Sequence, residues 1–281
     1  MSSSATGATL RLPVGLFHER ARHGTARLRL LAGTDELRVQ EAAAAGEPRA
    51  SLVTALLAAC TTAIGDLADI DESLVQALCI GDREALLLHL HRLTFGEAIE
   101  AVVSCPGCAE LLDLDLRVAD LLVPPAMPGE PEAVVAVGAA GASWRARLRR
   151  VTGADQLAVL YRSDAAAQLL RQCILSLERD DGTAWPLESI PQELAAALDG
   201  TLAELDPQAE IRLALACPAC RQNFTANFDA AGHLIAEIAA EAGLLLGEVG
   251  AIARAFRWRE TDILALPRPR RRAYAALAAQ R

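Results

Sequence analysis

Two short cysteine motifs carry the strongest chemical signal in the chain. Cys-Pro-x-Cys occurs at Cys105 and Cys108 and again at Cys217 and Cys220. A Cys-x-x-Cys turn sets two thiolates on one side of a metal ion, and four thiolates complete the tetrahedron that zinc prefers. A complete set leaves no open position for a substrate, so the motifs predict structural zinc rather than a catalytic metal. They favour one shared ion over two separate sites.

The same motif also occurs in thiol oxidoreductases, whose first cysteine lies at a helix N-terminus that lowers its pKa. Here an alternating strand pattern follows each motif, at 112–116 and at 224–228, so this activation is expected to be missing. A thiol-redox protein and a zinc-ribbon adaptor that binds RNA or protein stay open as alternatives, as do metal-free motifs.

Other chemistry-bearing patterns are missing from the sequence. It has no Walker loop, no nucleophile elbow, no Gly-x-Gly-x-x-Gly and no His-Glu-x-x-His. His89 and His91 are two residues apart, which on a helix turns them about 200° from each other, so they are expected to be ordinary helix histidines. His233 could replace a sulfur ligand, but four cysteines make it unnecessary. We therefore expect no enzyme and no small-molecule substrate.

Composition narrows the class of protein further. A chain of 281 residues with 52% hydrophobic residues can bury a substantial core, and its net charge of −9 repels nucleic acid and anionic membranes. The longest uncharged run, 50–65, is shorter than the roughly 20 residues of a membrane span. Seven cysteines in this spacing suit a reducing compartment, and no secretory signal opens the chain. We expect no nucleic-acid partner, no membrane partner and a cytoplasmic location.

Three motifs recur along the chain in the same order. Leu-Arg-x-x-x-Gly-x-Asp-x-Leu begins at Leu28 and again at Leu148, an offset of 120 residues. Leu-Leu-x-x-Cys begins at Leu56 and again at Leu169, an offset of 113, and the Cys-Pro-x-Cys motifs are 112 apart. A drift of eight residues is what loop deletions between the markers would leave, so the chain is predicted to be an internal duplication.

The predicted fold is α+β. Two duplicated strand-helix halves each end in a Cys-Pro-x-Cys zinc knuckle and join about a pseudo-two-fold axis, followed by a C-terminal helical tail. In each half a strand, 26–31 or 144–151, runs into a glycine turn where Asp35 or Asp155 caps a helix. Helices are then predicted over the cysteine-bearing segments 52–64 and 165–177, and over 81–93. The domain bounds are 1–122 (first half), 123–132 (Pro-rich linker), 133–231 (second half) and 232–281 (basic helical tail).

The tail differs from the rest of the chain in charge. From Arg254 onward eight arginines face two acidic residues, a local charge of +6 on an acidic body. Arginine is seldom fully buried unless it is paired, so these side chains are expected to point outward and dock an acidic partner protein, with large aromatics as anchors. The cluster is too short, and too poor in interleaved aromatics, to predict RNA binding. The predicted partner-binding residues are Trp258, Arg268, Arg270, Arg271, Arg272 and Tyr274.

Several of these motifs together resemble the baseplate proteins and baseplate hub assembly chaperones of contractile phage tails. The motifs are Leu12-Pro13-x-Gly15, Leu28-Arg29-x-x-x-Gly33-x-Asp35-Glu36, Gly81-Asp82-Arg83-Glu84, Leu93-Thr94-Phe95-Gly96 and Cys105-Pro106-x-Cys108. The tail segment from Trp258 to Tyr274 is similar to segments of tail-cluster proteins of prophages and phage-like injection systems. The resemblance implies a role in building a baseplate, with baseplate or other tail-assembly proteins as partners and incorporation into a tail-like particle as an alternative to a free cytoplasmic state. The second half lacks Gly-Asp-Arg-Glu.

Overall fold

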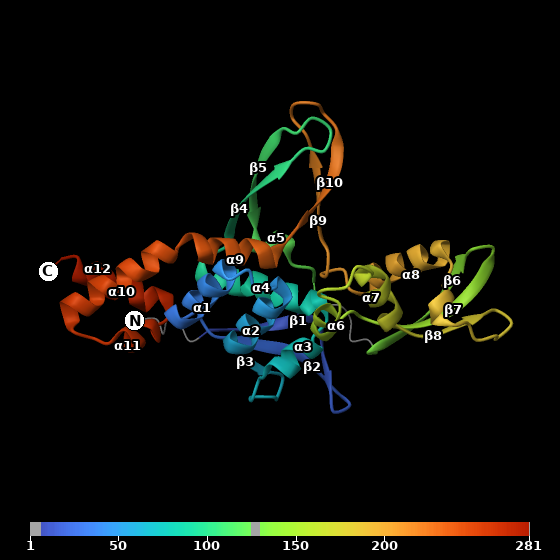
Figure 1. Ribbon diagram of the computed structural model, residues 1–281, viewed down its shortest axis with the longest axis horizontal. Coiled ribbons are helices and arrows are strands. Elements are labelled where there is room, and N and C mark those ends of the chain that lie inside the picture. The colour runs from blue at the N-terminus through green and yellow to red at the C-terminus, as the bar shows by residue number, and fades with distance from the viewer. Residues whose placement is uncertain (1–6, 125–129, 281) are drawn as a thin grey trace.

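The computed structural model describes residues 7–124 and 130–280, so the middle of the predicted Pro-rich linker, 125–129, lies outside the described residues. The molecule is elongated (Figure 1). The first half forms its centre, the second half extends to one end, and the C-terminal helices extend to the other. Two β-hairpins project side by side from the centre. None of the described helices is long and apolar enough to cross a bilayer.

The described strands form two three-stranded antiparallel sheets, β1-β2-β3 and β6-β7-β8, and two hairpins, β4-β5 and β9-β10. The strands of the first half are β1 (Ala8–His18), β2 (Ala21–Leu28), β3 (Thr61–Ile64), β4 (Ala98–Ser104) and β5 (Leu111–Arg117). Those of the second half are β6 (Glu132–Ala139), β7 (Ala142–Arg149), β8 (Ile174–Arg179), β9 (Ile211–Ala216) and β10 (Asn223–Phe228).

The helices fall into three groups along the chain. The first half contains α1 (Gly33–Ala44), α2 (Arg49–Cys60), α3 (Glu72–Ala77), α4 (Ile80–Thr94) and α5 (Val118–Leu121). The second half contains α6 (Gly153–Ala158), α7 (Ala165–Cys173), the 3-10 turn η1 (Leu187–Ser189) and α8 (Gln192–Leu205). The C-terminal region contains α9 (Ala230–Ala240), α10 (Ala242–Phe256), α11 (Glu260–Leu264) and α12 (Arg268–Ala278). The predicted α+β class is confirmed.

Both halves follow one order of elements: two strands, two helices, a third strand, a short helical segment (α3 or η1), a longer helix and a hairpin. The second and third strands of each sheet even share a register irregularity at the same place, between Arg27 and Leu28 in one half and between Arg147 and Leu148 in the other. The predictions of single helices over 52–64 and 165–177 are wrong in the same way. Each helix ends at its cysteine, and the chain continues as β3 or β8, because the residues that follow pair with the middle strand of the sheet.

The glycine turn after the middle strand is built identically in both halves. Asp35 accepts two hydrogen bonds from Arg29, at 2.6 and 2.8 Å, and one from the backbone N–H of Ala32 at 2.8 Å. Asp155 does the same with Arg149, at 2.6 and 2.8 Å, and with Thr152 at 2.9 Å. The two aspartates thus cap their helices, as predicted, but from the first turn of the helix rather than from the N-cap position.

The first half has the larger core. The sheet β1-β2-β3 packs against α1, α2, α4 and α9 through buried aliphatic side chains that include Leu12, Leu28, Leu57 and Leu87. Leu234 and Ile238 of α9, which belong to the predicted tail 232–281, are part of this core. The second half closes a separate core: Trp144, Ala146, Leu148, Cys173, Ile174, Leu177, Leu194, Leu198 and Leu202.

The motif Gly81-Asp82-Arg83-Glu84 opens α4 at the contact between the halves. Asp82 is fully buried and accepts hydrogen bonds from the backbone N–H groups of Val14 and Gly15, both at 2.8 Å, where strand β1 is irregular. The backbone N–H of Gly81 donates to Asp206 of the second half at 2.9 Å, and any Cβ at this glycine would collide with the Asp206 carboxylate. The motif therefore fastens β1 and the second half to one helix start.

Two joints hold the three parts of the chain together. At the joint between the halves, Gly153 donates its backbone N–H to the carbonyl of Leu78 (3.1 Å) and Ile80 donates to Val151 (3.0 Å). At the joint between the first half and the C-terminal helices, Gly33 donates to Leu266 (3.3 Å) and Arg268 donates to Leu31 (3.0 Å). In each joint the chain just before a helix pairs with a glycine turn.

Candidate metal centre

Each hairpin ends in a cysteine turn of the same construction. In the first, Cys105 donates its backbone N–H to Glu110 (2.8 Å) and accepts from Ala109 (2.9 Å), which adopts the left-handed conformation at φ 60°. The second turn repeats these contacts 112 residues later, at 3.0 and 2.9 Å and with φ 61°, through Cys217, Gln222 and Arg221. A strand follows each turn, as predicted, so neither cysteine pair begins a helix.

The hairpins bring all four cysteines together. The sulfur atoms of Cys105 and Cys220 are 3.7 Å apart, those of Cys108 and Cys217 are 3.6 Å apart, and all four lie within 4.8 Å of one another. Four sulfurs about 2.3 Å from one ion would be about 3.8 Å apart, whereas a disulfide needs about 2.05 Å. All four thiols are free. The site therefore has the dimensions of a tetrahedral thiolate metal centre.

The surroundings suit a structural ion. Cys105 and Cys217 are buried beneath Leu112, Leu114 and Phe224, whereas the other cysteine of each motif is exposed at the hairpin tips. Hydrogen bonds from backbone N–H groups, first that of residue 220, lower the pKa of Cys217 to about 7. Near neutral pH a substantial fraction of Cys217 is therefore in the thiolate form, which is the form that binds a metal.

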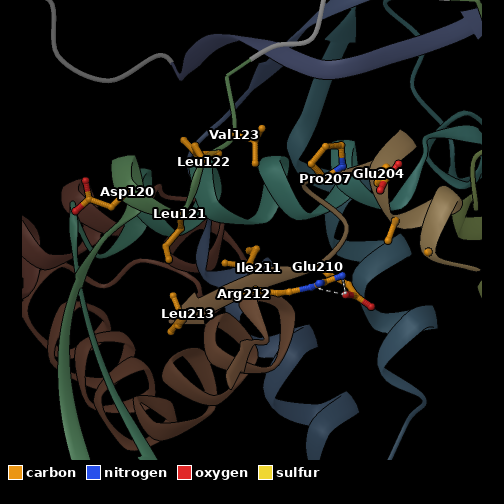
Figure 2. Close-up of a pocket in the computed structure, with 12 residues that line it drawn as sticks. Asp120, Leu121, Leu122, Val123, Glu204, Pro207, Glu210, Ile211, Arg212 and Leu213 are labelled. Atoms are coloured by element: carbon orange, nitrogen blue, oxygen red, sulfur yellow. Dashed lines mark hydrogen bonds and ion pairs between the residues drawn. The ribbon is translucent and has the colours of Figure 1, made fainter. Parts of the chain in front are cut away.

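The base of the hairpins carries a hollow of about 710 Å³. Figure 2 shows that the side chains labelled around it are mainly aliphatic and acidic, and that the guanidinium of Arg212 pairs with the carboxylate of Glu210, at 2.8 Å. The residues lining the hollow include no cysteine, histidine or serine.

The predicted partner-binding arginines do not all face outward, and this expectation is wrong for two of them. Arg268 and Arg271 are only 4% and 1% exposed. Arg271 binds Glu36 at 2.8 and 2.9 Å and Glu248 at 2.7 Å, and Arg268 pairs with Glu241. Both arginines are the exception that the burial rule allows, because each guanidinium has carboxylate partners that offset the loss of hydration.

The remaining predicted partner-binding residues do reach the surface. Arg270 and Arg272 are exposed, and Trp258 is 37% exposed. The ring of Trp258 packs edge-on against that of Tyr274, with 4.8 Å between centroids, and Arg270 lies 5.9 Å from the Tyr274 ring. These four residues share one end of the molecule with the termini of α10 and α12.

Sequence reasoning missed the acidic partners of the buried arginines, above all Glu36. A signal for the joint was nevertheless present. The segment from Glu72 to Arg83 recurs 188 residues later from Glu260 to Arg271, with identical residues at both ends and a shared Ala-Leu pair before the helix start. In the structure α11 and α12 meet the first half as α3 and the start of α4 meet the second half.

The fold is thus an α+β body whose two hairpins converge on four free cysteines that could hold one metal ion. The family model described as T4 bacteriophage base plate protein matches residues 22–229, and the chain belongs to this family. The match spans both cysteine hairpins and ends just before α9. No curated protein and no solved structure matches the chain.

Proposed function

We propose that this chain is a non-enzymatic structural or assembly protein of the baseplate of a phage tail or contractile injection system. The family match over residues 22–229 carries the proposal, because it includes the whole region from strand β2 to the second hairpin. Membership of this family implies contacts with other tail proteins. An assembly chaperone and a resident baseplate component are the two forms of this role.

We propose further that Cys105, Cys108, Cys217 and Cys220 hold one zinc ion. Sulfur separations of 3.6 and 3.7 Å support a shared tetrahedral site, and thiolates are ligands that select zinc. The two cysteine motifs are more than 100 residues apart in the sequence. One ion bound to both would therefore fix the two hairpins to each other. The loss of zinc would free the hairpins while leaving both cores intact.

The origin of this arrangement is, in our proposal, a duplication with a local two-fold axis through the metal. Shifting Cys105 and Cys220 by the repeat offset exchanges them for Cys217 and Cys108, and the two cross-hairpin distances agree within 0.1 Å. Such exchange is the mark of an isologous contact. The two halves meet through different surfaces, because the start of α4 in the first half contacts the glycine turn of the second. The proposed axis therefore relates the two hairpins and not the two halves. The proposed parts remain 1–122, 123–132, 133–231 and 232–281.

For the tail we propose a partner surface made of Trp258, Arg270, Arg272 and Tyr274. Exposed aromatic and arginine side chains dominate the binding energy of many interfaces, and the three-ring cluster of Phe256, Trp258 and Tyr274 keeps these anchors rigid. Arg272 is half exposed while it pairs with Glu241. An acidic surface on another tail protein would fit this patch.

Metal analysis of the purified chain tests the zinc proposal. Cys105→Ala and Cys217→Ala should each remove the metal of the cysteine centre completely, because three thiolates do not replace four. Cys173→Ala, at a buried cysteine that belongs to neither motif, is the control and should keep the metal. Loss of half the cysteine-bound metal in either knuckle variant would show two independent sites.

Incorporation into particles tests the proposed role. The wild-type chain should be found in purified tail particles or should co-purify with another tail protein from the same cells. Trp258→Ala combined with Tyr274→Ala should weaken the binding of the chain to that partner at least tenfold. Leu244→Ala, at an exposed residue of α10 outside the patch, is the matched control. Thiol–disulfide exchange activity that Cys→Ser changes abolish would instead support the redox alternative.

A further inference from the structure

A second group of side chains of metal-ligating types lies between the first half and α9, away from the cysteines. His91 on α4 faces His233 and Glu237 on α9, and one ligand atom from each of the three lies within 4.8 Å of the other two. Nε2 of His91 is 2.7 Å from a Glu237 carboxylate oxygen, and Nε2 of His233 is 3.6 Å from the same oxygen. Helices from the first half and from the C-terminal region thus converge on one point.

These polar atoms are buried without hydrogen bonds. His91 is 2% exposed, and neither of its ring nitrogens has a hydrogen-bond partner. The facing Nε2 of His233 and the shared oxygen of Glu237 are likewise buried and unbonded. The 2.7 Å contact is short enough for a hydrogen bond, but the oxygen lies too far off the axis of the ring N–H. A buried polar atom left without a partner costs about 1–3 kcal/mol, so a ligand that binds these atoms would stabilise the folded chain.

A cation between the three atoms would satisfy all of them. Ligand atoms that share an ion point at the ion and not at each other, which produces short off-axis contacts of this kind. Ligands about 2.0–2.1 Å from a tetrahedral zinc ion are about 3.3–3.4 Å apart, between the 2.7 and 3.6 Å separations found here. The rings of Phe95 and Phe228 flank the two histidines, with 5.5 Å between centroids in each pair, and exclude water from one side.

We propose that His91, His233 and Glu237 bind a second divalent transition-metal ion, with zinc as the first candidate. Two imidazoles and a carboxylate are a common protein ligand set for zinc. A water molecule would take the fourth position on the side where Glu237 and His233 are one-third and one-fifth exposed. The ion would fasten α9, and with it the C-terminal helices, to α4 of the first half.

The cysteine centre must be removed to test this site by itself. The full chain carrying serine at Cys105, Cys108, Cys217 and Cys220 should still bind about one Co²⁺ or Zn²⁺ per chain. The bound Co²⁺ should show ligand-field absorption but no thiolate charge-transfer band, because its ligands are nitrogen and oxygen. His91→Gln or His233→Gln in that background should abolish this binding. His89→Gln, two residues away on the same helix and outside the cluster, should leave it unchanged.

A second measurement covers the case in which the serine variant fails to fold. With all cysteines kept, the wild-type chain should hold about two metal ions, and His91→Gln or Glu237→Gln should reduce this to about one with the thiolate spectrum intact. The proposal is wrong if the folded cysteine-free chain binds no metal, or if the histidine changes leave the metal content unaltered.

Discussion

The two joints of the first half share a backbone pattern and differ in charge. At each of them the start of a helix pairs with a glycine turn. The fourth residue of that helix is an arginine that lies against the glycine: Arg83 against Gly153, and Arg271 against Gly33. Arg83 donates to neutral oxygens, the carbonyl of Val75 at 3.0 Å and the hydroxyl of Thr54 at 2.9 Å. Arg271 binds carboxylates instead.

The difference shows two ways to bury a guanidinium at equivalent positions of two joints. Burial lowers the pKa of Arg83 to about 10, and the nearby charge of Glu84 offsets the loss of hydration only in part. At the other joint the carboxylates of Glu36 and Glu248 neutralise the guanidinium, so each of the three charges depends on the others. We call the joint at Arg83 the neutral joint and the joint at Arg271 the charged joint, after the atoms that each arginine binds. The neutral joint lies inside the region that matches the family, and the charged joint includes the C-terminal helices beyond it. The charged joint should therefore be the more sensitive to a single substitution.

Removing Arg271 should have the largest effect. Arg271→Ala leaves Glu36, 2% exposed, without its closest cation, and breaking a buried ion pair in this way costs about 3–5 kcal/mol. The contacts of α11 and α12 with the first half should loosen before the rest of the chain unfolds. Urea unfolding measures the loss, and amide hydrogen exchange should rise in residues 260–278.

The matched control is Arg270→Ala, at an exposed neighbour that meets only the Tyr274 ring, which should change stability by less than about 0.5 kcal/mol. Pairing Arg271→Met with Glu36→Gln should recover part of the loss, since it removes two of the three charges and leaves Glu248 with Arg272 as its remaining cation. Equal effects of Arg271→Ala and Arg270→Ala would mean that the buried pairs contribute nothing.

Arg83→Met should cost less, about 2 kcal/mol, because it removes two hydrogen bonds to neutral oxygens and breaks no direct ion pair. Amide hydrogen exchange should rise in α3 and in the glycine turn before α6 rather than in the C-terminal helices. Urea unfolding of the two arginine variants side by side ranks the joints. A larger loss for Arg83→Met than for Arg271→Ala would reverse the comparison.

The sequence predicted the parts of this molecule that depend on local spacing. The motifs at Cys105 and Cys217 indicate the four-cysteine cluster, and Asp35 and Asp155 indicate the capped turns, because each pattern acts over a few residues. Arg271 was misassigned because its partner Glu36 lies 235 residues away, and no local pattern shows that the two will meet. Strands β3 and β8 were taken as helix for a similar reason, since their pairing with the middle strand is a tertiary contact that overrides local preference.

Glycine substitutions test how tightly each joint is packed. A Cβ at Gly33 would lie 3.1 Å from the Leu264 backbone and 2.9 Å from Arg271, whereas one at Gly153 would meet only the Arg83 guanidinium, at 2.5 Å. Backbone yields less than a side-chain end, so Gly33→Ala should cost about 1–2 kcal/mol and Gly153→Ala somewhat less. Thermal unfolding measures both. Gly243→Ala, in a helix with open space around it, should be neutral or stabilising; a loss at Gly153 above that at Gly33 would contradict this ranking.

The smallest expected effect concerns Glu84, the neighbour of Arg83 at the neutral joint. Burial, reinforced by the negative charge of Asp229, raises the pKa of Glu84 from 4.5 to about 7, although Arg83 and Arg49 partly oppose the shift. Because the folded pKa lies above the unfolded one, the folded chain holds a proton that the unfolded chain has lost between these pH values. The stability contributed by this group is therefore complete below about pH 4.5 and is lost as the pH rises through 7.

Glu84→Gln cannot ionise and should flatten this dependence. At pH 8 the variant should be more stable than the wild-type chain by on the order of 1 kcal/mol, a value reduced from the full shift because the side chain is not completely buried. At pH 5 the difference should be much smaller, because Glu84 is then protonated in the folded chain and only its partial ionisation in the unfolded chain still opposes folding. Urea unfolding at the two pH values provides the measurement, and Glu204→Gln, at an exposed acid of α8, is the control. An unchanged difference between pH 5 and pH 8 would show that Glu84 is hydrated in solution, and that the neutral joint accommodates a charge as readily as the charged one.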